Sequence, residues 1–178
     1  KEELHKHYHE LPPDQYDVIL ADPSWKYAFS VSDNRKVENH YPTMSVEELL
    51  ELNVPAAEDS ILFLWVTVPK LKEGLNVLEG WGFEYKTGMV WVKDRIGMGY
   101  YVRNQHEFLL IGTRGNIGTP LPENRPSSVI HAPRTKHSTK PEEVHRLIEK
   151  MYPGRKYLEL FARKGREGWN TWGNEAGQ

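Results

Sequence analysis

The sequence contains no cysteine among its 178 residues, which excludes disulfide bonds and thiolate metal sites and is typical of a cytosolic protein. It also lacks an apolar run of the roughly 18 residues that a membrane-spanning helix requires. No Gly-x-Gly-x-x-Gly motif follows a predicted strand, which disfavours a dinucleotide-dependent oxidoreductase. The 38% content of hydrophobic residues is that of an ordinary globular protein.

The chain divides into a short polar segment and one domain. Residues 1–16 form a polar lead-in, and residues 17–178 contain no repeat or change of composition that would mark a boundary. His5, His7 and His9 alternate in the lead-in and could share one face, but no cysteine accompanies them. We therefore expect an exposed segment there and no metal site.

Positive charge is concentrated in the middle third of the chain. The net charge is −2, yet residues 93–140 hold 8 Lys and Arg against 3 Asp and Glu, whereas residues 1–92 hold 8 against 16. A local basic patch can attract phosphates although the whole chain is acidic. Arg134, Lys136 and His137 are therefore candidate substrate-binding residues. A solvated loop region with a chance excess of basic residues is the alternative.

A short stretch near the start of the domain predicts a ligand site. Residues 17–21, Asp-Val-Ile-Leu-Ala, form an apolar run of the length of a buried strand. Pro23 has no backbone N–H, so the strand ladder should stop there. Asp22 and Trp25 would then stand on a stiff turn at the carboxyl end of the strand, where open α/β sheets bind ligands.

This turn has groups that suit a planar base with an amino group. The exocyclic amine of adenine is a poor nucleophile, because its lone pair is delocalised into the ring. Asp22 and the Pro23 carbonyl could each accept one N–H of such an amine, and Trp25 could stack on the base. At an unperturbed pKa of about 3.9, Asp22 would be ionised. A strand followed by an ordinary turn explains the same four residues equally well.

The rest of the chain predicts an α/β sheet that is mostly parallel and contains one hairpin. Apolar runs predict strands at 60–66, 83–93, 106–112 and 156–162. A capping-box pattern at 45–48 and apolar residues at helical spacing after Pro69 and Pro141 predict three helices. Residues 26–42, which include Tyr41, have no period, and their aromatic residues indicate a lid or a base-contacting loop.

Several sequence blocks together resemble, in the same order, one family of adenine amino-methyltransferases. The family includes the catalytic subunit of the eukaryotic messenger-RNA adenosine methyltransferase and has relatives in ciliates, bacteria and phages. The resemblance covers residues 15–175, and it is carried by DPSW (22–25), YPTMS (41–45), LFLWVT (62–67), WVK (91–93), HSTKPE (137–142), ELFAR (159–163) and WNTWGN (169–174).

The resemblance implies a Rossmann-like methyltransferase fold that uses S-adenosylmethionine, in a permuted order with the catalytic strand early and the cofactor-side strand last. It implies that the catalytic residues are Asp22, Pro23 and Trp25. The cofactor-binding residues that it implies are Asp22, Lys140, Glu159, Phe161, Arg163, Lys164, Arg166, Asn174 and Glu175. The substrate-binding candidates are Ser24, Tyr41, Arg134, Lys136 and His137.

The chain departs from the family pattern at a few positions. Ser24 stands where the commonest tetrapeptide has a second proline, which should make the loop less rigid. Glu175 stands where a glutamine is familiar. The segment after Arg163 is shorter than in the eukaryotic subunit, so the residues that follow it correspond only approximately. The zinc-finger region of that subunit has no counterpart in these residues.

The resemblance implies transfer of a methyl group from S-adenosylmethionine to the N6 amino group of adenine in nucleic acid, and we favour DNA. An RNA N6-adenosine methyltransferase and an inactive scaffold subunit that binds nucleic acid are the alternatives. The expected partners are nucleic acid and a second copy or a related subunit, with no membrane. The expected location is the cytoplasm for a bacterial or phage protein and the nucleus for a eukaryotic one.

Overall fold

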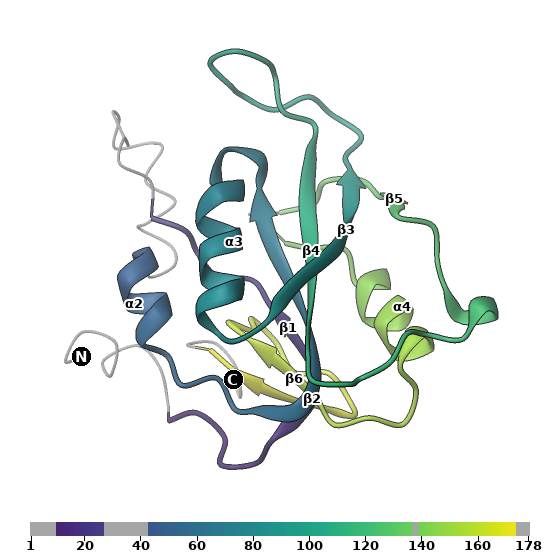
Figure 1. Cartoon of the computed structure of the whole chain (residues 1–178). Helices are drawn as coiled ribbons and strands as arrows, with labels where there is room; N and C mark the ends of the chain where they lie inside the picture. Colours follow the sequence, from purple (N-terminus) through teal and green to yellow (C-terminus); the bar gives the residue numbers. More distant parts are fainter. Residues whose placement is uncertain (1–9, 27–42, 137–138, 174–178) are drawn as a thin grey trace.

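The computed structural model describes residues 10–26, 43–136 and 139–173. These residues form one seven-stranded sheet in the order β5-β3-β4-β2-β1-β6-β7 (Figure 1). The strands are β1 (Tyr16–Ala21), β2 (Ala56–Thr67), β3 (Glu84–Val92), β4 (His106–Arg114), β5 (Val129–His131), β6 (Tyr157–Leu160) and β7 (Trp169–Trp172). The helices are α2 (Val46–Glu51), α3 (Leu71–Gly80) and α4 (Glu143–Met151), with short 3₁₀ turns η3 (Val68–Lys70) and η4 (Pro122–Asn124).

The direction of the strands determines which chain ends meet at one edge of the sheet. β4 pairs antiparallel with both β2 and β3, whereas the other described pairings are parallel. The start of β4 therefore lies at the same edge as the carboxyl ends of the strands that run opposite to it, namely β1, β2, β3, β6 and β7. We call this edge the carboxyl edge. The predicted sheet, mostly parallel with one hairpin, is confirmed.

Both faces of the sheet are buried, which explains the uninterrupted apolar run of β1. Ile19 and Ala21 belong to a core with residues of α2 and α3, and Val18 and Leu20 to a core with residues of α4. Figure 1 shows these helices on opposite sides of the sheet. A strand covered on both faces has no solvent side that would require polar residues. Burying one such side chain contributes about 1.5–3 kcal/mol.

The predicted helices form where their signals lie. The Ser45 hydroxyl accepts from the backbone N–H of Glu48 at 3.2 Å, and the Glu48 carboxylate accepts from the N–H of Ser45 at 3.1 Å. This capping box begins α2. α3 approaches the sheet closely at Gly74, where a β-carbon would lie 2.9 Å from a methyl group of Val66.

Two short strands were not predicted. β5 and β7 have 3 and 4 residues, too few to give a period of their own, and they are stabilised as strands by pairing with β3 and β6. The boundary between lead-in and domain stays a prediction, although Leu11 already packs against the core. Whether the strand order is a permutation also stays a prediction. No helix in the described part of the chain is long and apolar enough to cross a bilayer.

Candidate active site

The turn after β1 lies in the middle of the carboxyl edge. The backbone N–H of Asp22 donates to the carbonyl of Leu160 at 3.3 Å, so Asp22 is held between β1 and β6. The strand ends at Ala21, directly before Asp22 and Pro23, as predicted. Beyond it, the backbone N–H of Met44 donates to the Ser24 carbonyl at 3.0 Å. The turn is thereby fixed at both ends by backbone hydrogen bonds.

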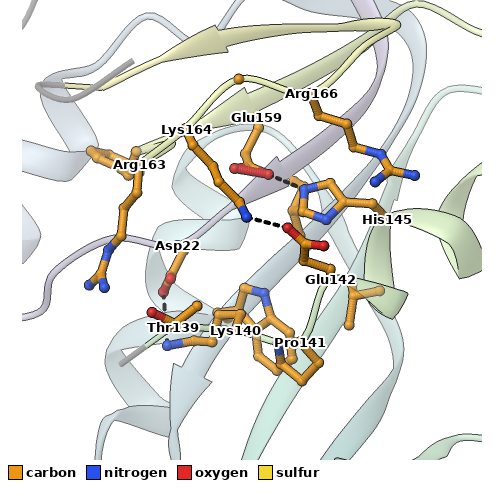
Figure 2. A pocket seen from close by; sticks show the side chains of 15 residues that line it. Asp22, Thr139, Lys140, Pro141, Glu142, His145, Glu159, Arg163, Lys164 and Arg166 are labelled. Atoms are coloured by element: carbon orange, nitrogen blue, oxygen red, sulfur yellow. Dashed lines mark hydrogen bonds and ion pairs between the residues drawn. The ribbon is translucent and has the colours of Figure 1, made fainter. Parts of the chain in front are cut away.

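A cavity of about 200 Å³ opens beside this turn on the face of the sheet that α4 covers (Figure 2). Its walls come from β1, β2, β6, α4 and the segments that flank them. They include seven residues predicted from the sequence, namely Asp22, Lys140, Glu159, Phe161, Arg163, Lys164 and Arg166. The structure therefore brings together, around one cavity, cofactor candidates that lie up to 144 positions apart in the chain.

Asp22 is part of a chain of four alternating charges. Lys140 Nζ lies 3.4 Å from Asp22 Oδ1 and 3.3 Å from Glu107 Oε1. The other oxygen of Glu107 lies 2.7 Å from Lys93 Nζ. The Lys140 side chain is only 15% exposed, so it is not the solvated helix terminus that its position in the sequence would otherwise suggest. Buried charges of this kind are stable only when each one is paired.

Burial and pairing act in opposite directions on the pKa values of this cluster. Burial raises the pKa of Asp22 above its ordinary value, although Lys140 opposes the shift. Burial alone would also raise the pKa of Glu107, but Lys140 and Lys93 together lower it. Burial would lower the pKa of Lys140, and the two carboxylates raise it instead. The expectation of an unperturbed Asp22 is therefore wrong, because it took no account of burial.

Two tryptophans support the lysines of the cluster. Lys140 Nζ lies 5.7 Å from the centre of the Trp65 ring, and Lys93 Nζ lies 4.9 Å from that of Trp91. The two rings contact each other edge to face at 6.0 Å. A cation over an aromatic face is attracted by the ring quadrupole. The rings therefore help to hold both ammonium groups in the orientation that Glu107 requires.

The chain turns sharply directly after β6, at Phe161, which lines the cavity. Phe161 has a φ of 63°, a left-handed conformation that is costly for a bulky residue. Its ring packs edge to face on Trp172 at 5.3 Å, which helps to keep it in place. Strained residues of this kind are concentrated at binding sites, where the surrounding structure holds them.

The side of the cavity near α4 contains further ion pairs (Figure 2). Glu159 bonds to the ring of His145, and Lys164 bonds to Glu142. Arg166 makes two hydrogen bonds to Glu149, at 3.0 and 2.9 Å. Because Arg166 already has a carboxylate partner, it fastens the segment after β6 to α4. The buried Nδ1 of His145 makes no hydrogen bond to the described residues.

Trp25 does not take the predicted position. Its ring is only 7% exposed and belongs to the core on the α2 and α3 side of the sheet. Its Nε1 donates to the carbonyl of Trp65 at 3.3 Å. Asp22 instead lines the cavity on the α4 side. The expectation of an open stacking face at Trp25 is therefore wrong for this structure, because the turn directs the two side chains to opposite faces.

The predicted substrate-binding residues are only partly placed. Arg134 and Lys136 are exposed on the segment that leads to Lys140. Tyr41, His137, Asn174 and Glu175 lie outside the described residues, as do residues 27–42 of the expected lid and the three histidines of the lead-in. The roles of these residues stay predictions.

Sequence reasoning missed Glu107, although it is the residue that joins the two lysines. A signal was present, because Glu107 alternates along β4 with Leu109 and Ile111, which face the core. A charged residue at a core-facing position calls for a buried partner. His145 and Glu142 were missed as well. Nothing in the local helical pattern marks them, because their partners Glu159 and Lys164 come from β6 and the segment after it.

A family profile described as MT-A70 matches residues 16–175. The chain belongs to the MT-A70 family. The family predicted from the sequence blocks is therefore confirmed, and with it the prediction of a methyltransferase.

Several curated MT-A70 relatives are similar over nearly the whole chain. The type II methyltransferase M.MunI of a Mycoplasma species is 38% identical over 93% of this chain and 80% of its own length. The N(6)-adenosine-methyltransferase catalytic subunit METTL3 of Homo sapiens is 31% identical over 90% of this chain. A probable N(6)-adenosine-methyltransferase MT-A70-like protein of Oryza sativa is 35% identical. The chain spans 28% and 23% of the length of these two eukaryotic relatives.

Proposed function

We propose that this chain transfers a methyl group from S-adenosylmethionine to the N6 amino group of adenine in nucleic acid. The observation that carries the proposal is the partly buried carboxylate of Asp22, held by Lys140 at the mouth of a cavity in an MT-A70 domain. The names of the relatives, a type II methyltransferase and N(6)-adenosine-methyltransferases, support the same reaction class.

The residues around the cavity fit S-adenosylmethionine by their chemistry. The cofactor has an amino acid end with both charges, a sulfonium, a ribose diol and a planar base. Lys140 and Arg163 are cations suited to its carboxylate, whereas Asp22 and Glu159 are acceptors suited to its ammonium and hydroxyl groups. Leu20 and Phe161 offer apolar contact. The unpartnered Nδ1 of His145 is a polar atom that a ligand could satisfy.

When bound, the cofactor supplies an electrophilic methyl group on a sulfonium. The protein's task is to present the adenine amine to it with the nitrogen lone pair directed at the methyl carbon. The Asp22 carboxylate would accept an N–H of the amine and draw electron density toward the nitrogen. The ammonium of Lys140 keeps this carboxylate in one orientation, so the geometry is set before the substrate arrives. The proton that the amine loses afterwards passes to Asp22 or to water.

We favour DNA as the substrate. The type II methyltransferase is matched over 80% of its own length. METTL3 of Homo sapiens, by contrast, is matched over 28%. RNA remains the alternative that the similarity to METTL3 supports. The requirement for a second copy or a related subunit and the cellular compartment stay predictions.

Mass spectrometry of nucleosides tests the proposal. The chain is incubated with S-adenosylmethionine and either plasmid DNA or RNA, and each nucleic acid is digested and analysed for N6-methyladenine. The Asp22→Asn variant serves as the negative control. Glu84→Gln, an exposed acid at the opposite end of β3, serves as the matched variant that should keep full activity. Absence of the modified base from both nucleic acids would refute the proposal.

Calorimetry distinguishes the enzyme from an inactive scaffold. An enzyme binds S-adenosylmethionine, and a scaffold that binds only nucleic acid does not. Retention of Asp22 and of its partner Lys140 favours the enzyme.

A further inference from the structure

The connection between β3 and β4 carries an exposed group of large apolar side chains near its middle. Tyr101 is fully exposed and Tyr100 is 92% exposed, and Met98 and Val102 are exposed to 71% and 68%. We call residues 98–102 the aromatic tip. Exposed apolar residues scattered singly need no explanation, but a group of this size in one short segment indicates a contact surface.

The aromatic tip is carried on an ordered stalk, which we define as residues 93–97 and 103–105. The N–H of Lys93 donates to the Gln105 carbonyl at 2.8 Å, and the N–H of Gly97 donates to the Asn104 carbonyl at 2.7 Å. The chain turns back tightly at Gly99, where a β-carbon would lie 1.9 Å from the Val102 carbonyl oxygen. The two tyrosines are therefore displayed at the end of an extended hairpin, which projects from the sheet in Figure 1.

The stalk rises from the same edge of the sheet as the candidate active site. It begins at Lys93 and ends just before Glu107, and these two residues are ion-paired at 2.7 Å. Glu107 is in turn paired with Lys140, which holds Asp22. The base of the stalk is therefore a surface that a polymeric substrate with its reacting group at Asp22 would have close by.

Positive charge surrounds the base of the stalk. Arg95, Arg103 and Arg134 are exposed on or beside it, and exposed Lys136 follows Arg134 closely in the chain. The Arg134 guanidinium lies beside Gly97, 4.0 Å from the place that a β-carbon on this glycine would occupy. The backbone N–H of Arg134 donates to the Asp94 carboxylate at 2.8 Å. Asp94 is the acid of this segment, and Arg95 lies 3.7 Å from its carboxylate. The surface thus combines exposed aromatic rings with an excess of cations.

We propose that the aromatic tip packs its tyrosine rings against unstacked bases that neighbour the target adenine, while the arginines at the stalk base bind phosphates. Aromatic rings beside basic side chains are the combination by which proteins bind exposed bases. The excess of cations favours a polyanion over an apolar protein partner. This inference rests on the proposed function, since it concerns the same substrate.

Binding measurements with a matched pair of variants test the inference. Fluorescein-labelled single-stranded and duplex DNA and single-stranded RNA are titrated with wild type, with Tyr100→Ala/Tyr101→Ala and with Tyr100→Phe/Tyr101→Phe. The alanine variant should bind at least about tenfold more weakly, and the phenylalanine variant should stay within about twofold, because stacking does not need the hydroxyl. The salt dependence should be the same in all three, because tyrosine neutralises no phosphate.

Each other outcome has a distinct meaning. If wild type binds and methylates nucleic acid and the alanine variant equals it in affinity, the inference is wrong and the proposed function stands. If the alanine variant binds nucleic acid normally but loses self-association in sedimentation velocity, the tip is a protein contact and the inference is again wrong. If wild type binds nucleic acid through the tip but methylates none, the contact between the tip and bases stands, and the proposed function and the target adenine fail. If wild type binds none of the three nucleic acids, both fail.

Discussion

Lys140 Nζ lies 3.3 Å from Glu107 Oε1, and this contact joins two parts of the site that are separate in sequence. Lys140 precedes α4, whereas Glu107 lies on the antiparallel strand. Lys140 also pairs with Asp22, so a chain of contacts runs from Glu107 to Asp22. We therefore expect Glu107 to position the carboxylate that we assign to the reaction.

Asp22→Asn should lower the methylation rate by about 10²- to 10³-fold, as loss of one preorganised polar contact does in other enzymes. The amide keeps the shape of the side chain but loses the negative charge. Folding should be retained, because Asp22 borders the cavity and packs in neither core. The rate is measured from N6-methyladenine formed over time and the fold from circular dichroism. A variant as active as Glu84→Gln would remove Asp22 from the mechanism.

Glu107→Gln should destabilise the chain by about 3–5 kcal/mol, because it leaves two buried ammonium groups without their shared partner. The free energy of unfolding is measured by urea denaturation. Adding Lys93→Met to Glu107→Gln should restore part of the loss, since Lys93 then no longer leaves an ammonium without the carboxylate that it pairs with, whereas Lys140 keeps Asp22. Additive losses in the double variant would show that the two residues are not coupled.

The stabilisation by Glu107 should depend on pH. Its pKa in the folded chain is lowered, because its two lysines outweigh burial. Such a carboxyl contributes stability above its unfolded pKa of about 4.3, and this contribution is lost as the pH falls through the folded pKa. The raised pKa of Lys140 affects stability only in alkaline solution. The difference in unfolding free energy between wild type and Glu107→Gln should thus be constant from about pH 6 to 8 and shrink below about pH 4. A difference independent of pH would contradict the pairing.

The rate should fall in acid at a higher pH than an ordinary aspartate would produce. Burial raises the pKa of Asp22, and the carboxyl accepts an N–H in the required way only when it is ionised. The acid limb of kcat/KM reports the free enzyme and should lie above about pH 4. The residual activity of Asp22→Asn should lack this limb. A limb shared by both proteins would assign it to another group.

Arg134→Ala combined with Lys136→Ala should weaken nucleic-acid binding and flatten its salt dependence. Each lost phosphate contact lowers the slope of log K against log salt by about 0.9 for duplex DNA. Titrations at several salt concentrations measure the slope. Arg114→Ala is the matched control, because Arg114 ends β4 at the opposite edge of the sheet. An unchanged slope in the double variant would place the phosphate contacts elsewhere.

Local patterns were sufficient to predict most elements of the fold and part of the site. The run before Asp22 predicted β1, and the capping box predicted α2, because both signals lie within a few residues. To predict the role of Glu107 one would have to know which residues meet its side chain in the folded chain. Its partners Lys93 and Lys140 lie far from each other in the sequence, so no local pattern contains this information. Trp25 was misjudged because its direction depends on the turn at Pro23, which no local pattern specifies.

The reversed direction of β4 has a consequence for how this domain can diversify. A hairpin inserted beside the site begins and ends on the ligand side, so its length and residues can change without shifting any strand of the sheet. Chimeras that exchange only residues 94–105 between members of the family should therefore fold, and they offer a route to altered target choice on an unchanged catalytic scaffold.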